Sequence, residues 1–239
     1  MIGVQEVFES RRREINDMIE LMFFLETQEE ERENGISKYN QFFIRGEQVI
    51  LPYQALINIL KSNVTLMIYN IIEFVVTNAL ISVYDELKKQ GLVYTDVNAH
   101  ICTLWRKAMI KATEDPYANM STVLRKNEEI ITAIIEKKVL EFDPRDTMAG
   151  GSLDGERILK TFNDHGIDIR GGDSYNSEIL RNIKERRNRL AHGDVSFIDA
   201  VRDDSITEIK SSSEKVMKFL EFLLEQINYY IANQGFKLV

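Results

Sequence analysis

Hydrophobic residues recur at intervals of three and four along almost the whole chain, and this spacing is typical of helices with one buried face. The intervals predict helices over about residues 4–33, 53–89, 97–113, 120–142, 154–164, 175–192 and 204–233. Between residues 35 and 52 we expect a loop or a short extended piece, with a small hairpin around Gly46. The sequence therefore predicts an all-α, antiparallel bundle with long helices.

Half of the 12 glycines fall between residues 143 and 173, where the helical pattern is interrupted. Leu153, Ile158, Leu159 and Phe162 still follow a helical stripe within this stretch. We therefore expect an irregular but ordered connection, and not a linker between domains. A chain of 239 residues with 44% hydrophobic residues suits one generous domain, so residues 1–239 are expected to form a single domain.

The stretch from Leu66 to Val83 is nearly apolar and has the length of a membrane span. It contains Asn70, Glu73 and Asn78, and a carboxylate near the middle of a span costs about 2.5–3.5 kcal/mol. The stretch is therefore interpreted as the buried central helix of a bundle, with no membrane partner. No basic segment followed by an apolar core opens the chain, so a cytoplasmic protein is expected.

Composition limits the chemistry that the chain can perform. The single cysteine, Cys102, excludes an intramolecular disulfide framework and a Cys-rich zinc site. His100 and His165 have no partners at ligand spacing and are expected to be surface or capping residues. We therefore expect no metal site and no cofactor.

The net charge of −8 argues against a protein that coats nucleic acid, but the charge is unevenly distributed. Residues 181–193 carry a net +4, since five Lys and Arg residues stand against Glu185 alone. An acidic protein with one concentrated basic segment has a place to hold an anion. The RNA-binding candidates in this segment are Arg181, Lys184, Arg186 and Arg189.

Arg187 breaks the helical pattern of the same segment. At 100° per residue, Ile179, Leu180, Ile183 and Leu190 fall within one arc about 100° wide, and Arg187 falls inside that arc. Violations of this kind concentrate at functional sites. The plainer alternative is that Arg187 extends its head to solvent or pairs with a buried carboxylate such as Glu73.

His192 occupies the last helical turn, directly before Gly193, where a histidine can donate to the free carbonyl groups of the helix end. Five residues separate it from Arg187, so the two side chains point about 140° apart on an ideal helix. They can line one cleft only if a second surface closes over the helix end. A twofold copy of the chain is the commonest source of such a surface.

The segment resembles the Rx4–6H motif of the HEPN superfamily, in the branch that reads RNxLAHGxxSF before a long terminal helix. The residues that carry this resemblance are Arg186-Arg187-Asn188-Arg189-Leu190-Ala191-His192-Gly193, followed by Ser196-Phe197. Upstream, Tyr69-Asn70-x-x-Glu73 is similar to the second-helix signature of that branch. The helical segment between Gly150 and Gly166 and the last helix also fit the resemblance.

The resemblance implies a HEPN-like fold and a metal-independent endoribonuclease of the toxin–antitoxin or anti-phage kind, active as a homodimer. A cognate antitoxin or defence-system protein would be a further partner. His192 would act as base or acid, Arg187 would bind the phosphate, and Asn188 would orient His192 or the scissile phosphate. Asn70 and Glu73 would hold Arg187 or respond to what binds at the site, and a purely structural role for both residues is the open alternative.

One position departs from the family pattern. HEPN toxins that are silenced by a nucleotidyltransferase carry a tyrosine two residues after the histidine, and here that position is Asp194. Silencing by modification is therefore not expected. The alternative function is a HEPN-like module that binds RNA, a nucleotide or a partner protein without cleavage. A purely structural dimerisation module would leave the basic segment unexplained.

Overall fold

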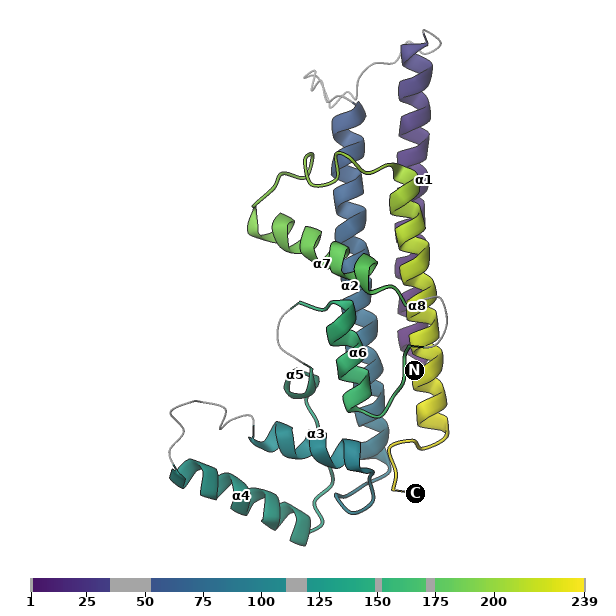
Figure 1. Ribbon diagram of the computed structural model, residues 1–239. Coiled ribbons are helices and arrows are strands. Elements are labelled where there is room, and N and C mark those ends of the chain that lie inside the picture. Colours follow the sequence, from purple (N-terminus) through teal and green to yellow (C-terminus); the bar gives the residue numbers. More distant parts are fainter. Residues whose placement is uncertain (1, 35–52, 111–119, 149–151, 171–174, 239) are drawn as a thin grey trace, which may run out of the picture.

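Three long helices, α1, α2 and α8, run side by side and form the body of the molecule (Figure 1). The computed structural model describes residues 2–34, 53–110, 120–148, 152–170 and 175–238. Its helices are α1 (Ile2–Glu33), α2 (Tyr53–Lys89), α3 (Ala99–Ile110), α4 (Met120–Ile135), α5 (Pro144–Thr147), α6 (Gly155–Asp164), α7 (Ser177–His192) and α8 (Ile206–Ala232). The all-α prediction is confirmed for the described residues.

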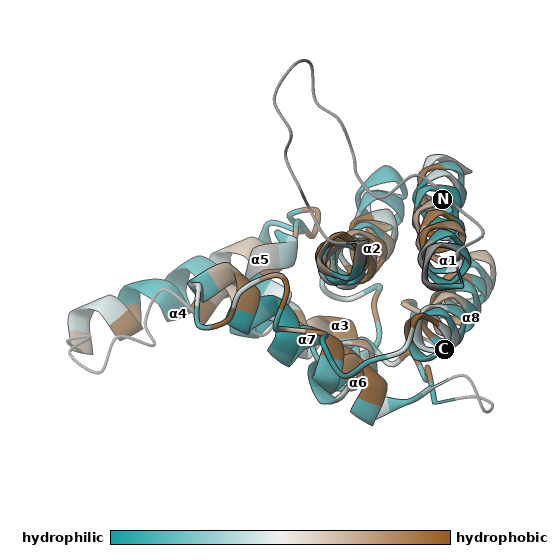
Figure 2. Ribbon diagram, turned by 90° about the horizontal axis from the view of Figure 1, so that it is seen from above, coloured by the Kyte–Doolittle hydropathy of each residue, from teal (hydrophilic) through white to brown (hydrophobic). Residues whose placement is uncertain are grey.

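The shorter helices lie on one side of α2. Helix α7 packs across the middle of α2, and α6 lies beside α7 (Figure 1). Helices α3 and α4 pack on each other at the end of the bundle that carries the C-terminus, and α4 projects away from the long helices (Figures 1 and 2). The bundle therefore has a broad body and one protruding arm.

Helix α2 is the central element of the core. By length and composition it could cross a membrane, but more than half of its most apolar window is buried inside the protein. It contacts α1, α7 and α8, and Ile72, Val76 and Leu80 are among its buried residues. Burial of apolar surface against other helices, instead of lipid, explains its composition. This packing is consistent with a soluble protein.

Helix α4 ends earlier than its apolar pattern indicates. The predicted segment ran to residue 142, but the helix stops at Ile135 because Lys137 adopts a left-handed conformation with φ of 51°. The chain then turns back, Val139 pairs with Val93, and the Leu140 amide donates to the Leu92 carbonyl. Tertiary pairing therefore replaces the helix that the local pattern favours. The expected loop at 35–52 lies outside the described residues.

The arm is anchored to the bundle through α3. Trp105, the single tryptophan of the chain, is buried on α3 with its ring centroid 5.6 Å from that of Tyr94. Ile130 and Ala133 are the buried residues of α4, the helix that packs on α3. Cys102 is half-buried and its thiol donates to the Tyr94 carbonyl, which agrees with a packing role for this residue.

His165 caps α6, as predicted, but it is buried and not at the surface. Its Nδ1 lies 2.6 Å from the Thr161 carbonyl oxygen. Because a carbonyl only accepts, Nδ1 carries the proton, and Nε2 accepts the hydrogen bond from the Tyr84 hydroxyl. Burial lowers the pKa of His165, so the ring is neutral in the folded protein.

The free energy of unfolding is therefore expected to fall as the pH drops from neutrality. A histidine pKa that is lowered by folding gives full stability above the unfolded value of about 6.5, and this stability is lost progressively at lower pH. Urea titrations between pH 7 and pH 5 should show a steeper loss in the wild type than in a His165→Gln variant. His192→Gln, at an exposed position on α7, is the matched control and should keep the wild-type slope. Equal slopes for all three proteins would contradict the role given to His165.

Candidate functional site

Helix α7 is positioned by one buried face and by a capping residue at each end. Leu180, Ile183 and Leu190 are buried, in agreement with the predicted arc. The Asn176 side chain accepts a hydrogen bond from the Ile179 amide and caps the start of the helix. At the other end Gly193 adopts φ of 75°, and the Asp194 amide donates to the Arg189 carbonyl. His192 is thereby fixed as the last helical residue.

Arg187 lies on the half-buried side of α7 and faces α2. Its guanidinium carbon lies 4.5 Å from the centre of the Tyr69 ring, in a cation–π arrangement. Its Nη2 lies 4.0 Å from Oε1 of Glu73. Arg187 therefore pairs with Glu73, which the sequence had left as an open alternative. At 4.0 Å this is a long ion pair. The side chains are 32% and 39% exposed, so part of the guanidinium still faces solvent.

Asn188 links Arg187 to the Gly-rich connection. Its Oδ1 accepts a hydrogen bond of 3.0 Å from Nη1 of Arg187, and its Nδ2 donates 3.1 Å to Oγ of Ser152. The next residue, Leu153, donates its amide to the Tyr69 hydroxyl oxygen at 3.0 Å. The connection thus holds both Asn188 and Tyr69, the two groups that orient Arg187.

Tyr69 supports the site as a neutral phenol. Burial and the hydrogen bond with Glu73 raise the pKa of Tyr69 to about 12. The hydroxyl therefore keeps its proton near neutral pH, and the ring keeps the electron-rich face that attracts a guanidinium. Tyr69 can position Arg187 but is a poor proton acceptor.

The two candidates on α2 separate in the structure. Glu73 reaches Arg187, whereas Asn70 is exposed and lines a cavity of about 380 Å³ between α1 and α2, together with Arg11 and Met67. In the described part of the chain no hydrogen bond joins Asn70 to α7. Spacing on α2 alone could not distinguish these two positions.

His192 is exposed at the end of α7. Among the described residues it forms no side-chain hydrogen bond and no ion pair. Arg187 is therefore held in place while the imidazole of His192 is left open to solvent. Among the described residues no hydrogen bond joins Arg187 to His192, as the divergence of the two side chains on the helix predicts.

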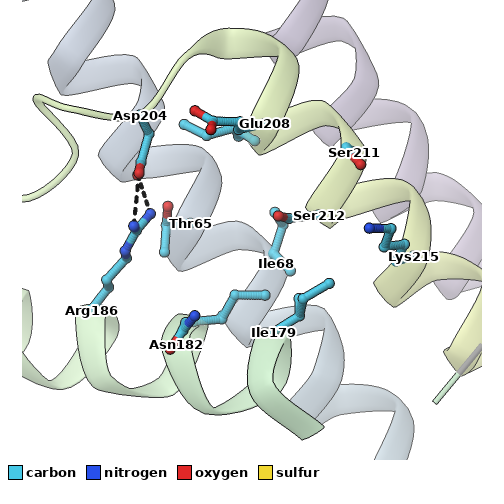
Figure 3. A pocket seen from close by; sticks show the side chains of 12 residues that line it. Thr65, Ile68, Ile179, Asn182, Arg186, Asp204, Glu208, Ser211, Ser212 and Lys215 are labelled. Atoms are coloured by element: carbon cyan, nitrogen blue, oxygen red, sulfur yellow. Dashed lines mark hydrogen bonds and ion pairs between the residues drawn. The ribbon is translucent and has the colours of Figure 1, made fainter. Parts of the chain in front are cut away.

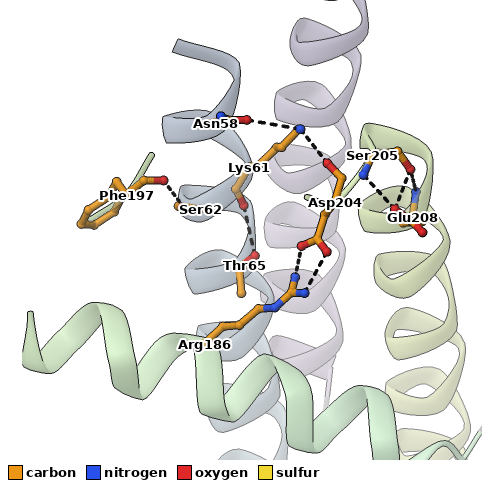
Figure 4. Close-up of polar contacts among 9 residues, drawn as sticks. All are labelled: Asn58, Lys61, Ser62, Thr65, Arg186, Phe197, Asp204, Ser205 and Glu208. Atoms are coloured by element: carbon orange, nitrogen blue, oxygen red, sulfur yellow. Dashed lines mark hydrogen bonds and ion pairs between the residues drawn. The ribbon is translucent and has the colours of Figure 1, made fainter. Parts of the chain in front are cut away.

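Two cations of the basic segment are neutralised by neighbouring carboxylates. Lys184 lies 2.8 Å from Asp154, the residue that caps α6. Arg186 forms a two-pronged contact with Asp204, and Figure 4 shows this pair next to Lys61. Arg181 and Arg189 are exposed and have no ion pair within the described residues. The free positive charge of the segment is thus smaller than its composition indicates.

The loop after α7 is tied down to α2. Lys61 is buried, and its Nζ donates to the Asp204 carbonyl at 2.6 Å. Burial lowers the pKa of Lys61, and the charge of Asp204 partly opposes that effect. Ser62 donates 2.6 Å to the carbonyl of Phe197, the last residue of the motif (Figure 4). These contacts fix the loop that follows His192 against α2.

A cavity of about 350 Å³ lies between α2, α7 and α8. Its lining includes the apolar side chains of Ile68, Ile179 and Ile183. Figure 3 shows the Arg186–Asp204 pair at one end of the cavity and Lys215 towards the other. Its size lies within the range of small-ligand sites.

The described residues contain no group of three or more His, Cys, Asp and Glu side chains that could hold a metal ion.

The residues that orient Arg187 could be found only in part from the sequence. Tyr69 belongs to a recognisable motif, but Ser152 stands alone before the cap residue Asp154 and carries no periodic signal.

Comparison with known proteins identifies the family. The family model described as MAE_28990-like HEPN matches residues 4–236, which is nearly the whole chain. No curated protein and no solved structure matches. The matched region includes all of α2 to α8 and most of α1. The chain therefore belongs to the HEPN family, as its all-α bundle and the motif on α7 had indicated.

Proposed function

We propose that this protein is a metal-independent endoribonuclease with its reaction centre at Arg187 and His192. The observation that carries the proposal is the contrast between the two side chains. Arg187 is held by Tyr69, Glu73 and Asn188, whereas His192 is unattached five residues later at the helix end. A fixed cation beside a free imidazole suits phosphate chemistry.

The reaction needs a base, an acid and a cation. The 2′-oxygen of a ribose attacks the neighbouring phosphorus and loses its proton to a base. The bond from phosphorus to the 5′-oxygen breaks, and an acid protonates that oxygen. The products are a 2′,3′-cyclic phosphate and a 5′-hydroxyl. His192 would serve as base or acid, and Arg187 would stabilise the charge on the phosphate oxygens. Asn188 would keep Arg187 oriented.

A homodimer would complete the centre. One helix end supplies a single imidazole, which diverges from Arg187 by about 140° on an ideal helix. A twofold copy would bring a second His192 and a second Arg187 to the same cleft, so that one histidine acts as base and the other as acid. In a cell, such a protein would act as a toxin or an anti-phage effector, paired with an antitoxin or a defence-system protein.

Cleavage of RNA is expected to persist in excess EDTA, because the proposed chemistry uses only side chains. The assay is incubation of purified protein with a single-stranded RNA, followed by analysis of the 3′ ends, which should carry 2′,3′-cyclic phosphate. The His192→Ala protein, purified in parallel, controls for contaminating nucleases. Cleavage that EDTA abolishes and Mg²⁺ restores would overturn the mechanism.

The second candidate function is binding without cleavage. One observation favours it: the cavity between α2, α7 and α8 could take a small ligand. RNA or a nucleotide would then bind equally to the wild type and to His192→Ala, and the RNA would stay intact in both. A comparison of the wild type with His192→Ala therefore distinguishes cleavage from binding without cleavage.

A further inference from the structure

Asn70 belongs to the second-helix signature, but nothing in the proposed reaction uses it. In the described stretch of α2 between Gln54 and Asp85 it is the one exposed residue. Solvent, and therefore a ligand, reaches this apolar helix at that point. The cavity of about 380 Å³ between α1 and α2 lies at this position. We call it the α1–α2 cavity, and its other lining residues are Arg11, Glu14, Ile15 and Met67.

The polar side chains of the α1–α2 cavity are unpaired in the described part of the chain. Arg11, Glu14 and Asn70 form no side-chain hydrogen bond and no ion pair there. The neighbouring Arg12, by contrast, is paired with Glu221 of α8. A guanidinium, a carboxylate and a carboxamide thus line one cavity together with apolar side chains. This combination suits a ligand with an apolar body and several hydrogen-bonding groups.

Arg11 is oriented in the same way as Arg187. The guanidinium carbon of Arg11 lies 4.2 Å from the centre of the Phe74 ring. The corresponding distance from Arg187 to the Tyr69 ring is 4.5 Å, and both rings belong to α2. An arginine whose face rests on a ring keeps the N–H donors at its edge for a ligand. Two arginines held in this way on one helix can bind one ligand that spans both.

The α1–α2 cavity adjoins the candidate reaction centre. Glu73, which contacts Arg187, is three residues from Asn70, or about 4.5 Å along the axis of α2. On an ideal helix Glu73 lies about 60° to one side of Asn70, and Phe74 lies about 40° to the other. An RNA strand with a phosphate at Arg187 can therefore place a neighbouring base in the cavity. The cavity is about 25 Å along α2 from Tyr53, the end of the helix that borders undescribed residues.

The hydrogen-bonding groups of the cavity match guanine. A carboxylate such as that of Glu14 can accept from two adjacent donors. Among the four RNA bases only guanine presents two adjacent donors, at N1 and at its 2-amino group. Guanine also carries two adjacent acceptors, N7 and O6, which suit the paired donors of an arginine such as Arg11. Arg11 and Glu14 are one helical turn apart on α1, so both can reach the same base.

We propose that the α1–α2 cavity binds a guanine base of the RNA substrate, next to the phosphate that contacts Arg187. In this arrangement Glu14 accepts from N1 and the 2-amino group, Arg11 donates to N7 and O6, and Asn70 lies between the base and the scissile phosphate. The cavity thereby selects where the strand is cut. RNA as the source of the base rests on the proposed ribonuclease function, but binding of the base does not require cleavage.

The first test is the binding of a 2′-O-methyl oligouridylate that carries one central guanosine. This strand cannot be cleaved, because the attacking hydroxyl is blocked. Measured by fluorescence anisotropy, the wild type should bind it about tenfold more tightly than strands with a central adenosine or inosine, since a two-pronged contact to a base discriminates by at least that factor. Inosine lacks only the 2-amino group and therefore tests the contact with Glu14. Equal affinities for the three strands would overturn the proposal.

Variants of α1 assign the preference to the cavity. Glu14→Gln should reduce the preference for guanosine to within about twofold, because an amide offers one acceptor where the carboxylate offers two. Glu14 is exposed, so the fold should be unaffected. Glu6→Gln is the matched control, since Glu6 is an exposed residue of α1 outside the cavity lining, and it should keep the wild-type preference. Arg11→Ala should weaken binding of the guanosine strand, whereas Arg13→Ala, likewise exposed and outside the lining, should keep the preference. A preference that survives Glu14→Gln would overturn the proposal.

The same strand with ordinary ribose separates this proposal from the ribonuclease proposal. If both are correct, the wild type cuts at a phosphate that flanks the guanosine. Guanine-selective binding without cleavage would retain the cavity assignment and refute the ribonuclease. Cleavage without preference for any base would retain the ribonuclease and refute the cavity assignment. Guanosine 5′-monophosphate should bind at least about tenfold more weakly than the strand, because it lacks the contacts of the neighbouring nucleotides. Equal affinity would assign the cavity to a free nucleotide and overturn RNA as the source of the base.

Discussion

Replacement of His192 by alanine is expected to lower the rate of RNA cleavage by about 10²- to 10⁴-fold, the usual contribution of a general acid or base. The fold should be retained, because His192 is exposed and forms no side-chain hydrogen bond or ion pair with the described residues. The measurement is the single-turnover rate on a labelled single-stranded RNA, with unfolding in urea as the check on stability. In cells, a growth defect caused by the wild type should disappear with this variant.

His100→Ala is the matched control for this experiment. His100 is also exposed, but it lies on α3, far along the chain from the motif. Its loss should leave the cleavage rate unchanged. If His192→Ala cleaves as fast as the wild type, His192 is neither base nor acid, and the binding function becomes the better account of the site.

Replacement of Arg187 by lysine is expected to lower the cleavage rate by about 10²-fold although the charge is kept. A guanidinium can contact Glu73, the Tyr69 ring and a phosphate oxygen at once, since its donors point in fixed directions. An ammonium group is a point charge and cannot reproduce that geometry. Because the side chain is about one-third exposed, the free energy of unfolding should change by less than about 1 kcal/mol.

Arg181→Lys provides the comparison on the same helix. Arg181 is exposed and unpaired within the described residues, so lysine should serve there equally well and the rate should stay within twofold of the wild type. Equal rates for Arg187→Lys and the wild type would make Arg187 a general electrostatic contact. A loss of stability in Arg187→Lys that parallels the loss of rate would assign it a structural role.

Most helices could be predicted from the sequence because their signals are local. The last helix begins with a capping box in which Ser205 and Glu208 exchange hydrogen bonds, and α7 ends at a left-handed glycine. Where the signal is not local, the prediction failed. The apolar residues Val139 and Leu140 extend the pattern of α4, but they pair with the segment at Leu92 and Val93 instead.

The candidate site shows the same division. The position of Arg187 on an apolar arc, and Glu73 as its partner, followed from helix geometry and from the motif. The contact between Asn188 and Ser152 joins residues 36 positions apart, and the neutralisation of Lys184 by Asp154 joins residues 30 apart. Contacts of this range depend on how α6 and α7 pack together, which periodicity does not encode.

Trp105 gives the molecule a natural optical probe at one end. As the single tryptophan, buried on α3 beside Tyr94, it reports through its fluorescence on the α3–α4 arm. Circular dichroism is dominated by the long helices α1, α2 and α8, because they contain most of the helical residues. The two signals therefore observe different parts of the same chain. Their comparison during unfolding distinguishes an arm that opens on its own from one that unfolds together with the bundle.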